Sequence, residues 1–175
     1  MASKNLFTFP GNGAANAMRD GVIVITDNTQ ELLAAANYAS MRALLGVSAK
    51  RIIAATIFHP LVDVSLITGG FYYRVPSLLN GKDITAVHAQ VVTAGTTGAL
   101  TVQVTRIRSG TPVSVLSTAL SIDSGTTASH QAATPAVIDL TKDDLATNDL
   151  LRVDVNGVPT TKPKGLMLTI EVGTD

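Results

Sequence analysis

Short segments of alternating apolar and polar residues fill the chain from about residue 81 to residue 172. Val87, Ala89 and Val91 alternate with polar residues, and Val102 and Val104 repeat the pattern. An alternation with a period of two is typical of half-buried β-strands, and clusters of Gly, Ser, Thr, Asp and Pro between the segments are typical of turns. Further strands are expected at 113–122, 136–140, 150–155 and 166–172. This spacing predicts a mainly β fold, a β-sandwich with jelly-roll or Greek-key wiring.

Two connections within this region have local signals of their own. The dipeptide Asn156–Gly157 favours a hairpin turn, although Pro159 and the following Pro-Lys-Gly group lengthen the connection. Residues 142–145, Lys-Asp-Asp-Leu, are compatible with one helical turn between strands.

Before this region, residues 51–75 contain three apolar runs, at 52–58, 62–67 and 71–75, which predict three further strands. Four of the seven aromatic residues lie between Phe58 and Tyr73. That clustering indicates either a local core or the seat of a subunit contact. Burial in the core is the commoner role for Phe71, Tyr72 and Tyr73.

The first fifty residues have a different character. Asn28 and Glu31 have the spacing of a capping box, and Leu32 and Leu33 begin an apolar face that continues to Gly46. A helix is therefore expected at about 29–45. Residues 1–21 are rich in Gly, Asn and Ala and cannot form a core, so they are either a disordered terminus or an extended arm that orders on a neighbouring subunit. The expected division is an attachment region, 1–50, followed by the sandwich, 51–175.

Composition narrows the classes of partner. The chain has 13 basic and 13 acidic residues and no Lys/Arg block, so nucleic acid is not an expected partner. A net charge of zero removes electrostatic repulsion between copies and favours a homo-oligomer. The most apolar stretch, 52–67, is interrupted and too short to span a bilayer, and no secretory signal is visible, so synthesis in a cytoplasm without membrane insertion is expected.

Candidate catalytic and metal-binding residues are sparse. His59, His88 and His130 have no metal-ligand spacing, and no nucleophile motif or cysteine accompanies them. Five aspartates crowd into residues 139–154 without the spacing of a calcium loop, and Asp149 and Asp154 have the positions of turn and surface residues. The sequence therefore predicts no enzyme, no catalytic residue, no metal and no cofactor.

Four segments in the second half carry a resemblance to a known class of protein: LSTALSIDSG (116–125), ATPAVI (133–138), DLLRVDV (149–155) and KGL (164–166). Together they resemble a β-sandwich module of structural proteins in tailed-bacteriophage virions, over roughly residues 81–172. The resemblance implies a virion component assembled in the host cytoplasm, such as a capsid decoration, head-fibre, neck or tail-fibre adaptor protein. Its expected partners are other virion proteins, either the major capsid protein or neck and tail proteins.

Within that interpretation, the N-terminal region would bind neighbouring virion subunits. The expected partner-binding residues are apolar positions of the arm and helix and one aromatic residue: Leu6, Phe7, Phe9, Leu32, Leu33 and Tyr72. The alternative is a receptor- or glycan-binding sandwich of a tail fibre or adaptor. The lack of Phe, Tyr and Trp after residue 81 argues against that alternative, although polar loops around 124–134 could still bind a ligand.

Overall fold

The computed structural model describes Ser40 and residues 50–173. The predicted arm at 1–21 and, apart from Ser40, the predicted helix at 29–45 lie outside the described residues. In chain order the elements are β1 (Arg51–Asp63), β2 (Ile67–Arg74), η1 (Ser77–Leu79), β3 (Lys82–Thr93), β4 (Leu100–Arg108), β5 (Thr111–Ser114), β6 (Leu116–Thr118), β7 (Leu120–Ile122), η2 (Ser129–Gln131), β8 (Val137–Ile138), β9 (Asp144–Leu145), β10 (Leu150–Gly157) and β11 (Lys164–Gly173).

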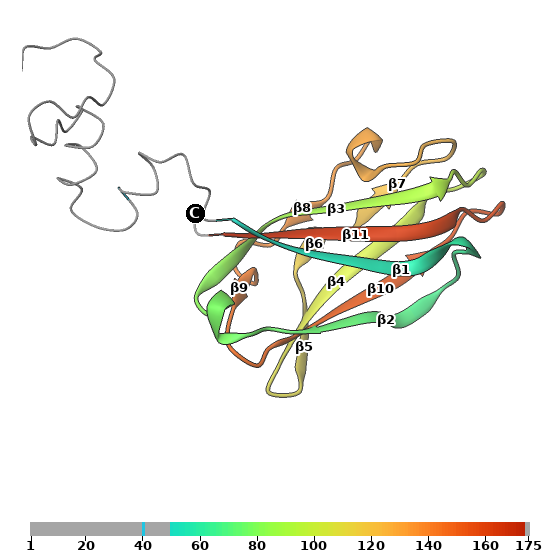
Figure 1. Ribbon diagram of the computed structural model, residues 1–175. Coiled ribbons are helices and arrows are strands. Elements are labelled where there is room, and N and C mark those ends of the chain that lie inside the picture. Colours follow the sequence, from blue (N-terminus) through green and yellow to red (C-terminus); the bar gives the residue numbers. More distant parts are fainter. Residues whose placement is uncertain (1–39, 41–49, 174–175) are drawn as a thin grey trace, which may run out of the picture. The chain divides into compact units, whose positions relative to one another are not determined.

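The strands pair exclusively antiparallel within three sheets of the described region. One sheet has the order β1-β11-β3-β9, and a second has the order β2-β10-β4-β5 with β7 also paired to β4. The two short strands β6 and β8 pair with each other. Figure 1 shows β11 between β1 and β3 in one layer, and β10 between β2 and β4 in the other. The described part of the chain is thus mainly β, and its antiparallel sheets are consistent with a β-sandwich.

Both large sheets contribute to one hydrophobic core. In β10, Leu151 and Val153 are buried, and they lie beside Val104 and its neighbours on β4. In β11, Leu166, Leu168 and Ile170 are buried at every second position, as the alternation in the sequence predicts. Each buried Val, Leu or Ile side chain contributes roughly 1.5–3 kcal/mol to folding. This core fixes which face of each strand points outward.

The predicted strands at 87–91, 101–105, 150–155 and 166–172 are confirmed as parts of β3, β4, β10 and β11. The segment 113–122 divides into β5, β6 and β7 because its parts have different partners: β5 and β7 pair with β4, whereas β6 pairs with β8. From 136–140, only Val137–Ile138 forms a strand.

The expectation of three strands between residues 51 and 75 is wrong, because this region forms two, β1 and β2. The apolar run at 62–67 is shared between the end of β1 and the start of β2. Val64 lies between them, fully buried, and its N–H donates to the carbonyl of Pro163 at 2.8 Å. The run is therefore apolar because Val64, in the connection between the two strands, enters the core, and not because a separate strand lies there.

Two local predictions also need correction. The helical turn expected at 142–145 is not formed, since Asp144–Leu145 is strand β9, which pairs with Lys82 and Asp83 of β3. The Asn156–Gly157 hairpin is not formed either, because β10 and β11 belong to different sheets and Gly157 still pairs with Thr101. The chain then crosses between sheets through the proline-containing segment 158–163.

None of the helices within the described residues is long and apolar enough to cross a membrane.

Candidate functional site

The outer surface of the β1-β11-β3 sheet is the most unusual exposed feature of the described residues. Met167 of β11 is paired with Thr56 of β1 on one side and with Gln90 of β3 on the other. Two residues further along β11, Thr169 is paired in the same way with Ala54 and His88. Because side chains alternate along a strand and Leu166, Leu168 and Ile170 enter the core, these rows face away from it. The surface, here called the β11 face, consists of Ile52, Ala54, Thr56, Pro60, His88, Gln90, Val92, Met167 and Thr169.

The β11 face contains no Lys, Arg, Asp or Glu. Several of its apolar side chains are exposed: Ile52 is 67% exposed, Val92 51% and Met167 38%. Leu61, near the end of β1, is 77% exposed. Antiparallel sheets with one solvated face normally alternate apolar residues inward with polar residues outward. Between Glu171 and the Pro60 end of β1, the outward side of these three strands has no charged residue, and depletion of charge is a feature of the centres of protein interfaces.

Charged pairs lie at both ends of strands β1 and β11. At one end, Lys50 donates to Glu171 with an Nζ–Oε2 distance of 2.9 Å, and this hydrogen bond lowers the pKa of Glu171 below its ordinary value. At the other end, Asp63 and Lys164 are register partners with Oδ1 and Nζ 3.8 Å apart. An uncharged centre with charged ends matches the division of protein interfaces into an apolar core and a polar rim.

The outer surface of the second sheet is different. There Asp154 accepts hydrogen bonds from Arg152 Nε and Nη2 at 3.0 and 2.9 Å, from the backbone N–H of Gly69 at 2.7 Å and from Thr105 Oγ1 at 3.2 Å. The hydrogen bond to Asp154 raises the pKa of Arg152. The expectation that Asp154 is a surface residue is wrong, because it is only 5% exposed. The Asp154 carboxylate is thus paired by groups of its own sheet and of Gly69.

Of the six predicted partner-binding residues, Leu6, Phe7, Phe9, Leu32 and Leu33 lie outside the described residues. Tyr72 is 52% exposed on β2, where its register partner is Arg152. It therefore belongs to the polar outer surface and not to the β11 face. The neighbouring Phe71 and Tyr73 are partly buried and pack against the core, as does Phe58. The aromatic cluster thus supplies the core with three rings and the surface with one.

The residues of the β11 face were not among the predicted binding residues. A signal for them exists in β1, where apolar residues occupy both alternating sets of positions from Ile52 to Phe58. A strand with one solvated face needs apolar residues at every second position only, so the excess marks a second face that avoids water. The pairing of β1 with β11, more than a hundred residues later, has no comparable local signal.

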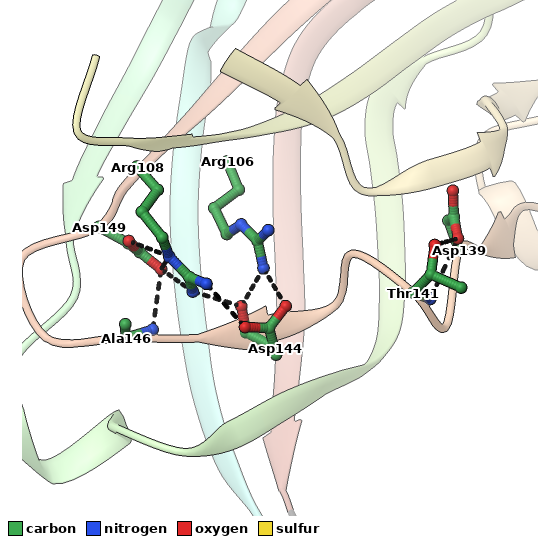
Figure 2. Close-up of polar contacts among 7 residues, drawn as sticks. All are labelled: Arg106, Arg108, Asp139, Thr141, Asp144, Ala146 and Asp149. Carbon is green, nitrogen blue, oxygen red and sulfur yellow. Dashed lines mark hydrogen bonds and ion pairs between the residues drawn. The ribbon is translucent and has the colours of Figure 1, made fainter. Parts of the chain in front are cut away.

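An ionic cluster joins the end of β4 to the loop that contains β9 (Figure 2). Arg108 donates from Nε and Nη2 to Asp149, with the shortest contact at 2.6 Å, and from Nη1 to Asp144 at 2.8 Å. Arg106 also pairs with Asp144, and the N–H of Ala146 donates to Asp149 at 2.8 Å. Asp149 is only 2% exposed, so the expectation of a surface position is wrong here as well.

The electrostatics of this cluster indicate a structural role. Burial would raise the pKa of both Asp144 and Asp149, but hydrogen bonds from the arginines, and from Ala146 to Asp149, outweigh it and hold both pKa values below the ordinary range. The bonds to Asp149 and Asp144 in turn raise the pKa of Arg108. Two cations and two anions neutralise one another, and both carboxylates stay ionised near neutral pH. Such a group holds the loop that contains β9 against the end of β4.

The cluster predicts an acid-sensitive stability. Because the folded pKa values of Asp144 and Asp149 lie below the unfolded ones, the stabilisation is complete above about pH 4 and is lost as pH falls through the folded values. Asp139 adds to the same dependence, since hydrogen bonds from Lys142 and Thr141 lower its pKa to about 2. We expect the urea midpoint of unfolding to fall between pH 5 and pH 2, and less steeply in Asp149→Asn. Equal slopes in both proteins would contradict this assignment.

The three histidines occupy separate exposed positions, His59 in β1, His88 in β3 and His130 in η2. Among residues 50–173, no group of three or more His, Cys, Asp or Glu side chains has a geometry that could hold a metal ion. Asp123, in the turn after β7, accepts a hydrogen bond from the N–H of Ala133 at 2.7 Å. The carboxylates of Asp123, Asp139, Asp144, Asp149 and Asp154 serve turns and ion pairs within the chain.

Comparison of the chain with protein-family models, with curated proteins and with solved structures finds no match.

Proposed function

We propose that the protein is a structural subunit of a tailed-phage virion, a capsid decoration, head-associated or neck protein that packs against neighbouring protein through the β11 face. The observation that carries the proposal is the uncharged, partly apolar outer surface of three adjacent strands, bounded by ion pairs. Removing this surface from water is favourable and leaves no charge without a partner. The segments at 116–125, 133–138 and 149–155 supply the resemblance to virion modules.

The finer parts of the proposal concern the wiring and the N-terminal region. We propose that the sandwich has jelly-roll or Greek-key wiring. Two antiparallel sheets that share one core support this, because such wiring builds that architecture. Residues 1–50 would act as an arm and helix that dock the subunit to neighbours. The β11 face then adds a second, sheet-based contact to the same assembly.

The test of this function is the composition of purified particles. Quantitative mass spectrometry on particles of the phage that encodes the chain should detect it at a fixed ratio to the major capsid protein, after washing in high salt. Detection only in the soluble fraction of the infected cell would contradict a virion role.

The runner-up function, recognition of a receptor or glycan, has one observation in its favour. Tyr72 is 52% exposed and lies beside the Arg152–Asp154 pair, which is the combination of an aromatic ring and polar groups that sugar sites use. Phe71 and Tyr73 are turned toward the core, so only one ring of β2 is offered. Under this function, purified protein would bind on a glycan array and Tyr72→Ala would abolish the signal.

A further inference from the structure

We infer that Asn156 is a site of spontaneous deamidation, at which the side-chain amide is lost as ammonia and the residue becomes aspartate or isoaspartate. The dipeptide Asn156–Gly157 does not form the hairpin turn that its sequence favours, so a hairpin does not account for this pair of residues. The same dipeptide occurs at residues 80–81 and, outside the described residues, at 12–13. The sites at 80–81 and 156–157 differ in backbone pairing and in side-chain hydrogen bonds.

The reaction needs only the dipeptide and water. The backbone nitrogen of Gly157 attacks Cγ of Asn156 and forms a C–N bond, and the side-chain nitrogen takes up the backbone N–H proton and leaves as ammonia. Water then opens the cyclic succinimide, at the side-chain carbonyl to give aspartate or at the main-chain carbonyl to give isoaspartate. Glycine favours the attack, because a residue without Cβ leaves the nitrogen accessible and the backbone free to turn.

Asn156 lies at a break in the pairing of β10. Val155 and Gly157 are paired with neighbouring residues of β4, Val102 and Thr101. Asn156 is therefore the extra residue of a β-bulge and has no register partner on β4. The pairing with β2 ends at Val155. The attack requires rotation about the backbone of the asparagine, and a residue outside the ladder can rotate at lower cost than a paired one.

The side chain of Asn156 is also available for the reaction. It is exposed, and within residues 50–173 it takes part in no hydrogen bond. The glycine that follows is required by the fold, since a Cβ atom at Gly157 would lie 2.6 Å from Oγ1 of Thr101. Close packing therefore excludes a bulkier residue at 157 that would slow the attack.

Asn80 is followed by glycine too, but hydrogen bonds hold both reacting groups. Its Oδ1 accepts from the N–H of Thr147 at 2.9 Å and from Thr147 Oγ1 at 3.2 Å. The N–H of Gly81, which would carry out the attack, donates to the carbonyl of Leu145 at 2.8 Å. These three hydrogen bonds resist the rotations that bring the nitrogen to Cγ, so the fold slows the reaction at Asn80.

Deamidation changes the protein in two ways. Each event adds a negative charge, at an exposed position of β10, to a chain whose formal net charge is zero. Isoaspartate also lengthens the backbone by one carbon atom, and this carbon follows Val155, the last buried residue of the strand. We expect the fold to survive the change, because the buried part of β10 precedes it.

Peptide mapping of the full-length protein, after incubation at mildly alkaline pH, tests the site. Trypsin places the two asparagines in separate peptides, 75–82 and 153–164, and neither peptide contains another Asn. In the folded protein we expect peptide 153–164 to be deamidated roughly tenfold faster or more than peptide 75–82, a factor that one or two hydrogen bonds supply. In concentrated urea the two rates should be similar, because the dipeptides are the same.

Asn156→Gln is the control variant, because its longer side chain would have to close a larger ring. It should abolish the modification of peptide 153–164 at times when the wild-type peptide is largely modified. Equal rates for the two peptides of the folded protein, or a faster rate at Asn80, would overturn the inference. So would a folded protein whose peptide 153–164 stays unmodified while the urea-unfolded protein reacts.

Discussion

Replacing Asp149 by alanine should lower the free energy of unfolding by about 3 kcal/mol, the lower end of the range for breaking a buried ion pair. Asp149 accepts from Arg108 through both carboxylate oxygens and from the N–H of Ala146, and it is 2% exposed. Alanine leaves those donors without a partner. The lower end applies because the Arg108 side chain is 37% exposed and water can solvate part of its charge.

Urea denaturation at pH 7 measures this loss, and Asp123→Ala is the matched control. The Asp123 carboxylate accepts a hydrogen bond from the N–H of Ala133, so removal of this side chain should cost about 1 kcal/mol. Equal losses in the two variants would show that the arginine cluster does not stabilise the fold.

Replacing Gly165 by alanine should cost about 3 kcal/mol, and the cause is the close approach of strands on the β11 face. A Cβ atom at Gly165 would lie 2.8 Å from Cα of Pro60 and 2.9 Å from Cγ2 of Val92. The backbone φ of Gly165 is +63°, a left-handed conformation that costs an L-residue about 1–2 kcal/mol. Overpacking against the backbone of β1 adds about 1–3 kcal/mol.

Gly125→Ala separates these two causes. Gly125 also has a left-handed φ, +78°, but nothing lies within 4 Å of its Cβ position. Its substitution should therefore cost about 1–2 kcal/mol, the conformational part alone. Urea denaturation measures both losses. If the two alanine variants lost the same free energy of unfolding, the close approach of Pro60 and Val92 to Gly165 would be contradicted.

Local periodicity explains which strands could be predicted from the sequence. β3, β4, β10 and β11 alternate cleanly because one side of each enters the core and the other does not. β1 and β2 lack that alternation, since β1 is apolar on both sides and the buried Val64 extends the apolar run through a turn. The short strands between residues 111 and 145 depend on pairing partners, which no local pattern specifies.

The candidate site could be predicted only in part, for a related reason. The neutral composition indicated a surface suited to protein contact, but the β11 face exists only because β1 and β3 flank β11, and that order follows from long-range pairing. Asp149 and Asp154 were misplaced on the surface because their burial depends on Arg108 and Arg152. The position of a carboxylate in the sequence does not show which basic side chain will form an ion pair with it in the folded protein.

The most direct test of the central claim places one charge on each outer surface. Thr169→Lys puts a cation at the centre of the β11 face, whereas Asn156→Lys puts the same side chain at an exposed position of β10 in the other sheet. Burying an unpaired Lys in an interface costs several kcal/mol, whereas a solvated one costs little. Quantitative mass spectrometry of purified particles should find Thr169→Lys reduced at least tenfold and Asn156→Lys retained at the wild-type level. Equal retention of both variants would contradict the assignment of the β11 face as an assembly surface.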